Sequence, residues 1–169
     1  MKLSELLLAE LDRETPRSRR ALAEVPVGKY DWKPHDRSMA LGYLTQLVAT
    51  MPSWIGMGIT MNELDVAPAS GSAMPREKLE TSEALIAALD KSATEARAAL
   101  QRTTDEFLMT PWKLLARGQV VQETPRWVMI QDTLNHWAHH RGQMTVYLRL
   151  VGAKVPAIYG PSADDKEFR

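Results

Sequence analysis

The chain has 169 residues, of which 44% are hydrophobic and 25% charged, an average globular composition that predicts one domain spanning residues 1–169. Lysine plus arginine equals aspartate plus glutamate at 21 each, so the net charge favours neither nucleic acid nor an anionic membrane as a partner. The sequence has no cysteine, which excludes disulfides and thiolate sites. It also has no apolar run near the ~18 residues of a membrane span. We therefore expect a cytoplasmic protein.

The first half of the chain predicts two helices. Leucines at helical spacing predict a helix over residues 3–25, and Pro16 is expected to kink or interrupt it. After an extended connector, a second helix is expected to run over residues 39–51. Pro52 is expected to bend this helix, because proline has no N–H to continue the hydrogen-bond ladder.

The middle of the chain predicts a loop, a third helix and a short hairpin. Residues 65–76 contain prolines, a glycine and small residues, which is typical of a loop. A third helix is expected behind Thr81 or Ser82 as its cap, because leucines and alanines recur every three or four residues over 85–100. The segment 114–121 is compatible with a small hairpin.

The last helix has the clearest pattern. Thr124 is expected to cap it, Pro125 suits its first turn and Gly152 marks its end. Seven residues share one face through spacings of three and four: Met129, Thr133, His136, His140, Met144, Tyr147 and Val151. This face is expected to be the packed side, so both His136 and His140 should point inward. Together the helices predict an all-α fold, an antiparallel four-helix bundle with long loops.

The segment Asn135–Gln143 contains three of the four histidines of the chain. His136 and His140 are one helical turn apart, and two imidazoles in that arrangement can bind one transition metal. The alternative is that both rings form hydrogen bonds with side chains or water, since a buried polar group needs a partner. His139 is expected to point roughly 100° away from His140 around the helix. The spacing alone leaves both interpretations open.

Four stretches of the chain resemble the DinB-like family of helical-bundle proteins. They are His136–Gln143, Trp32–Met39, Leu41–Leu44 with Met51–Trp54, and the tail Pro156–Ser162. The resemblance implies a four-helix bundle, commonly dimeric, that holds a divalent metal through three histidines. Relatives include thiol-dependent transferases and isomerases, while many members have no known reaction.

The resemblance also locates the metal ligands, and one of them is missing. Two family ligands fall on His136 and His140. The third belongs to a pattern like Leu-Gly-x-Leu-x-x-His-Val-Ala in the second helix, where this chain has Leu47. Leucine cannot bind a metal, and Met51 one turn on offers only a soft thioether. We therefore expect a degenerate, vestigial site in which zinc or nickel is weakly bound or absent.

Five further residues are expected to support this site or to line a pocket beside it: Asp132, Gln143, Tyr147, Trp54 and Trp137. The aspartate lies one turn before His136 and is expected to accept a hydrogen bond from that imidazole. The glutamine and the tyrosine offer an amide and a hydroxyl to a ligand. The two tryptophans are either core residues or pocket walls. Arg141 projects off the histidine face, which favours a salt bridge or a dimer contact over an anion site.

These residues support two functions of different classes. One is a metal-dependent transferase or hydrolase, in which the metal activates bound water or a thiol. The alternative is a non-catalytic homodimer that binds a small molecule or acts as a scaffold, without a tightly bound metal. Leu47 favours the second function, and the retained histidine pair favours the first. The neutral charge and apolar helix faces predict a homodimer in either case, with no nucleic-acid or membrane partner.

Overall fold

A computed structural model describes residues 2–69, 71 and 78–167 of the chain. Its helices are α1 (Leu3–Ala23), α2 (Leu41–Thr50), α3 (Pro52–Thr60), α4 (Ser82–Arg102), α5 (Asp105–Leu108) and α6 (Arg126–Leu150). Its strands are β1 (Glu63–Asp65), β2 (Pro111–Ala116) and β3 (Gln119–Pro125). The fold is an all-α bundle with one small sheet, as the helical periodicity predicts. Within the described residues, no helix is both long and apolar enough to cross a membrane.

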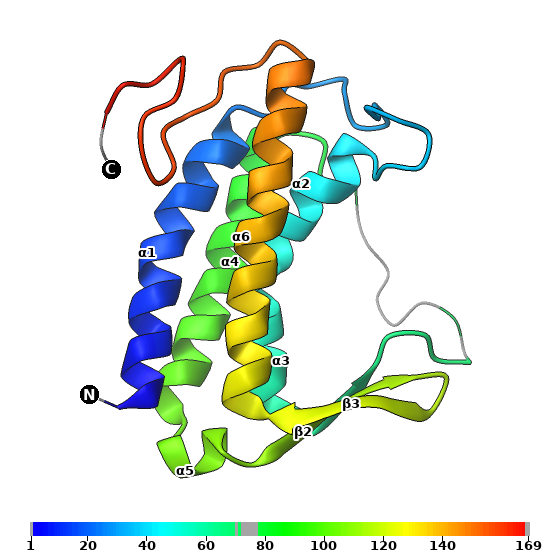
Figure 1. Ribbon diagram of the computed structural model, residues 1–169, viewed down its shortest axis with the longest axis vertical. Coiled ribbons are helices and arrows are strands. Elements are labelled where there is room, and N and C mark those ends of the chain that lie inside the picture. Colours follow the sequence, from blue (N-terminus) through cyan, green and yellow to red (C-terminus); the bar gives the residue numbers. More distant parts are fainter. Residues whose placement is uncertain (1, 70, 72–77, 168–169) are drawn as a thin grey trace.

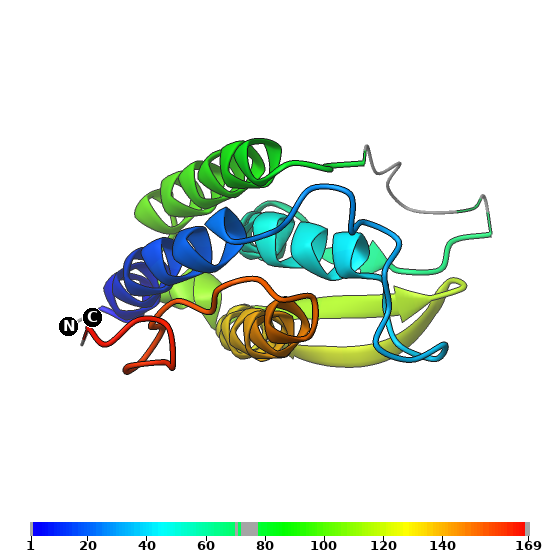
Figure 2. The ribbon, with the colours of Figure 1, turned by 90° about the horizontal axis from the view of Figure 1, so that it is seen from above.

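The bundle consists of α1, the α2–α3 pair, α4 and α6 (Figure 1). Helices α1 and α6 run in one direction, and α2–α3 and α4 run in the other (Figure 1). Viewed from above, the sheet projects sideways from the helices (Figure 2). The core lies between the four helical columns and is built mainly from leucines together with Trp137, Met51 and Met144.

The bend between α2 and α3 is held by side chains from two other helices. Because Pro52 has no N–H, the carbonyl of Val48 four residues earlier loses its helical donor. The indole Nε1 of Trp137 on α6 donates to this carbonyl over 2.7 Å. The hydroxyl of Ser92 on α4 donates to the neighbouring carbonyl of Ala49 over 2.8 Å. The bend predicted at Pro52 is confirmed, and it is stabilised by tertiary hydrogen bonds.

Helix α1 continues through Pro16, so the interruption that was one of the two outcomes expected there does not occur. Leu7 and Leu11 before the proline and Leu22 after it are all buried in the core. Packing on both sides of Pro16 therefore outweighs the one helical hydrogen bond that the proline removes.

Other helix boundaries differ from the prediction by a few residues. Helix α6 begins at Arg126, and Thr124 does not cap it, because Thr124 and Pro125 pair with β2 as the end of β3. Gly152 follows the end of α6 with a φ of +79°, the left-handed conformation expected there. Thr81 caps α4 by accepting a hydrogen bond from the Ala84 N–H, as predicted.

The hairpin predicted at 114–121 is confirmed and is longer than expected, and β1 adds a third strand parallel to β2. Arg117 and Gly118 form its turn, both with positive φ. The N–H groups of Ala67, Gly118 and Arg117 donate to the Asp65 carboxylate and hold its pKa below the usual value. Of the loop predicted over 65–76, Asp65 therefore belongs to a strand, while residues 70 and 72–76 lie outside the described residues.

Candidate functional site

His136 and His140 lie side by side on α6, with ring centroids 4.4 Å apart. His140 is buried, and its Nδ1 lies 2.9 Å from Oε1 of Gln143. The prediction that both rings point inward is right for His140 and wrong for His136, which is exposed. The His136 ring packs edge-on against Trp54 of α3, with ring centroids 5.9 Å apart, at the rim of a pocket that opens to solvent.

The third histidine of this segment also lies close to the pair. The His139 ring centroid is 5.3 Å from that of His140 and 6.5 Å from that of His136, although the residue starts about 100° around the helix from its neighbour. Partial shielding of the His136 ring from solvent lowers its pKa, and the nearby His140 and His139 lower it further. Each of these effects favours the neutral form of the His136 imidazole.

The position of the missing third ligand belongs to the core. Leu47 is only 5% exposed and packs in the central hydrophobic cluster, and Met51 is fully buried there. Among the described residues, no group of three or more histidine, cysteine, aspartate or glutamate side chains has the arrangement of a metal site. The residues present therefore do not fit a tight three-histidine metal centre.

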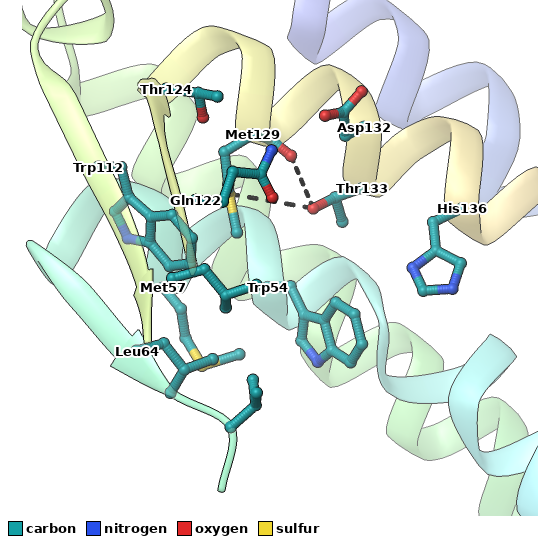
Figure 3. A pocket seen from close by; sticks show the side chains of 12 residues that line it. Trp54, Met57, Leu64, Trp112, Gln122, Thr124, Met129, Asp132, Thr133 and His136 are labelled. Carbon is teal, nitrogen blue, oxygen red and sulfur yellow. Dashed lines mark hydrogen bonds between the residues drawn. The ribbon is translucent and has the colours of Figure 1, made fainter. Parts of the chain in front are cut away.

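Of the five residues expected to support the pair, Gln143 and Trp54 contact it. The Asp132 carboxylate is exposed and turned away from the His136 ring, and no hydrogen bond joins these two described residues (Figure 3). The Tyr147 hydroxyl donates to the carbonyl of Met39 over 3.3 Å, which ties the connector before α2 to α6. Trp137 is a core residue, whereas Trp54 lines the pocket.

A cavity of about 260 Å³ lies beside His136, between α3, the sheet and α6 (Figure 3). Its walls are mainly apolar and are formed by seven side chains: Trp54, Met57, Leu64, Val66, Trp112, Leu114 and Met129. Of these apolar side chains, only Trp54 is predicted from the sequence to be a pocket wall. The alternation of Trp112 and Leu114 along β2 is a weak signal for a shared face, but β1 is too short for any periodicity to identify it.

Five polar side chains complete the lining of the pocket: Gln122, Thr124, Asp132, Thr133 and His136. The Thr133 hydroxyl donates to the Met129 carbonyl over 2.9 Å. Because side chains alternate across a sheet, Lys113 and Glu123 lie on its opposite face, where they form an ion pair with each other. Among the described residues that line the pocket, only Asp132 carries a formal charge.

Arg141 belongs to a different part of the molecule. Its guanidinium is 1% exposed, forms an ion pair with Glu14 of α1 and donates to Ser18 Oγ over 2.9 Å. The Tyr159 hydroxyl donates to the same Glu14 carboxylate over 2.8 Å, which fixes the C-terminal tail against α1 and α6. Burial alone raises the pKa of Glu14, but Arg141 and the hydrogen bonds hold it below its usual value. The salt bridge predicted for Arg141 is confirmed.

Comparison with known proteins agrees with the fold and with the resemblance noted in the sequence. The uncharacterized protein YrdA of Bacillus subtilis is 43% identical over 44 residues, and this match spans 26% of each protein. A DinB-like protein from Bacillus cereus superimposes with a TM-score of 0.71 over 92% of this chain and 97% of that one, at 22% identity. The DinB-like protein YjoA of Bacillus subtilis superimposes with a TM-score of 0.68 over 90% of this chain and 97% of that one, at 17% identity. A model of the DinB family matches residues 1–167, and the chain belongs to this family.

Proposed function

We propose that the protein binds a small, largely apolar molecule in the pocket between α3, the sheet and α6, without a tightly bound metal. The observation that carries this proposal is the cavity of about 260 Å³ with aromatic and thioether walls beside His136. A closed apolar cavity of roughly 150 Å³ can hold a benzene ring, so this pocket has room for one ring with a short substituent. The alternative weighed from the sequence, a small-molecule-binding protein, is the function that this geometry supports best.

The donor set argues against the metal-dependent transferase or hydrolase. Such an enzyme needs a metal held firmly enough to activate water or a thiol, and firm sites use three protein ligands or more. This chain supplies the pair His136 and His140 but has a buried leucine at position 47. The 4.4 Å separation of the two rings supports a second and weaker proposal, reversible binding of zinc or nickel by the pair.

A variant with a blocked pocket tests the proposal that the pocket binds a small apolar molecule. Ligand-observed NMR with 2-phenylethanol measures the affinity of a neutral aromatic probe for the wild-type protein. The variant Gln122→Trp places a large ring at the pocket, since Gln122 is an exposed residue of the lining. Val121→Trp is the matched control, because Val121 is the exposed neighbour on β3 and does not line the pocket. We expect binding to be lost in Gln122→Trp and kept in Val121→Trp; equal binding by both variants would show that the probe binds elsewhere.

A further inference from the structure

The opening of the pocket carries a negative charge. Asp132 and His136 are exposed lining residues, so they lie where the pocket meets solvent. A carboxylate can only accept hydrogen bonds, and no described residue forms an ion pair or hydrogen bond with that of Asp132. The carboxylate is therefore free to meet the head group of a ligand whose body occupies the cavity.

The cationic side chains nearest in sequence to the lining are engaged elsewhere. Lys113 projects from the opposite face of the sheet and pairs with Glu123. Arg126 is buried, and its guanidinium donates to the carbonyls of Gly58 and Met61 at the end of α3. A ligand with an anionic head would thus meet a carboxylate at the opening and no compensating cation among the described lining residues.

The walls favour a body that is flat and apolar. Trp54 and Trp112 project toward the cavity from α3 and β2, and the thioethers of Met57 and Met129 complete its sides (Figure 3). Methionine adapts to an aromatic ring, and aromatic side chains attract a cation that lies over their faces. These walls accept a neutral apolar body and carry no positive charge that would attract an anion.

We infer that the pocket selects molecules with an aromatic or aliphatic body and a cationic amine head over anionic molecules of the same shape. This inference rests on the proposed function, because it concerns the ligand of the same pocket. The Asp132 carboxylate provides the selection at the opening, and the tryptophan and methionine walls provide the affinity for the body.

Three probes of one shape test the inference: 2-phenylethylamine, 2-phenylethanol and phenylacetate, titrated by ligand-observed NMR at low salt. We expect the amine to bind roughly five- to ten-fold more tightly than the carboxylate, since a screened surface charge changes binding only severalfold. In Asp132→Asn the amine and carboxylate affinities should converge to within about two-fold, while that of 2-phenylethanol stays unchanged. Glu123→Gln removes a carboxylate from the opposite face of the sheet and should keep the wild-type order.

The outcomes separate a failure of this inference from a failure of the proposed function. If 2-phenylethanol binds in the pocket but phenylacetate binds as tightly as the amine, the inference is overturned and the proposed function stands. Persistence of the amine preference in Asp132→Asn would also overturn it, because the selecting charge would then lie elsewhere. If none of the three probes binds the wild-type protein, both the inference and the proposed function fail.

Discussion

Replacing Trp137 with phenylalanine tests how the bend between α2 and α3 is held. The Trp137 side chain is 1% exposed, and its Nε1 donates to the Val48 carbonyl, which Pro52 leaves without a helical donor. Phenylalanine keeps an aromatic ring but cannot donate, so a buried carbonyl loses its partner at a cost of about 1–3 kcal/mol. The smaller ring also leaves unfilled volume, which adds about 1 kcal/mol. We expect Trp137→Phe to lower the free energy of unfolding by about 2–4 kcal/mol.

Trp112→Phe is the matched control for this substitution. Trp112 is also buried, at 4% exposed, but its Nε1 has no hydrogen-bond partner in the described structure. Phenylalanine there removes an unsatisfied donor, and this gain of about 1–3 kcal/mol offsets the lost packing. The free energy of unfolding of Trp112→Phe should therefore differ from that of wild type by less than about 1 kcal/mol. Urea denaturation of both variants measures the difference, and equal destabilisation would refute the assigned role of the Trp137 hydrogen bond.

Three further predictions concern the buried ion pair, the metal site and the assembly. Glu14→Gln should destabilise the protein by about 3–5 kcal/mol at neutral pH, because it leaves Arg141 unpaired. The pKa of Glu14 in the folded protein lies below its usual 4.5. The stability advantage of wild type over Glu14→Gln should therefore be complete above pH 4.5 and decline as the pH falls through the folded-state pKa. A series of denaturation curves at different pH values that shows no such decline contradicts this prediction. Metal analysis of tag-free protein should find weak zinc or nickel binding that His136→Ala/His140→Ala abolishes, and equal metal in both proteins would exclude the pair as the site. Light scattering at micromolar concentration should show a homodimer, since large apolar side chains such as Val146 on α6 are exposed, and a monomer would rule it out.

The helical periodicity of the sequence predicts the bundle because each helix buries one continuous stripe. In α4 the stripe contains Leu85, Leu89 and Leu100, and all three are buried. Predictions from local sequence patterns are wrong where a tertiary contact favours a different conformation. Thr124 has the chemistry of a helix cap, but pairing with β2 takes it into a strand. Packing on both sides of Pro16 likewise keeps α1 continuous.

The site was only partly predictable because most of its parts come together from distant segments. The helical spacing places His136 and His140 one turn apart, and the structure confirms their proximity. The pocket walls, however, depend on β1 pairing in parallel with β2, a contact between segments about 50 residues apart that no local pattern encodes. The exposure of His136 follows from that pocket, since the ring lies at its rim.

Leu47 connects the stability of the fold with the chemistry of the site. Its side chain packs in the central core, so an imidazole at that position would need a partner for its polar nitrogens. Leu47→His should therefore destabilise the metal-free protein, and a metal bound by the new three-histidine set should restore stability by RT ln(1 + c/Kd), where c is the free metal concentration. Thermal denaturation with and without zinc measures both effects. Zinc should raise the Tm of Leu47→His far more than that of wild type; an equal shift would show that position 47 does not face the histidine pair.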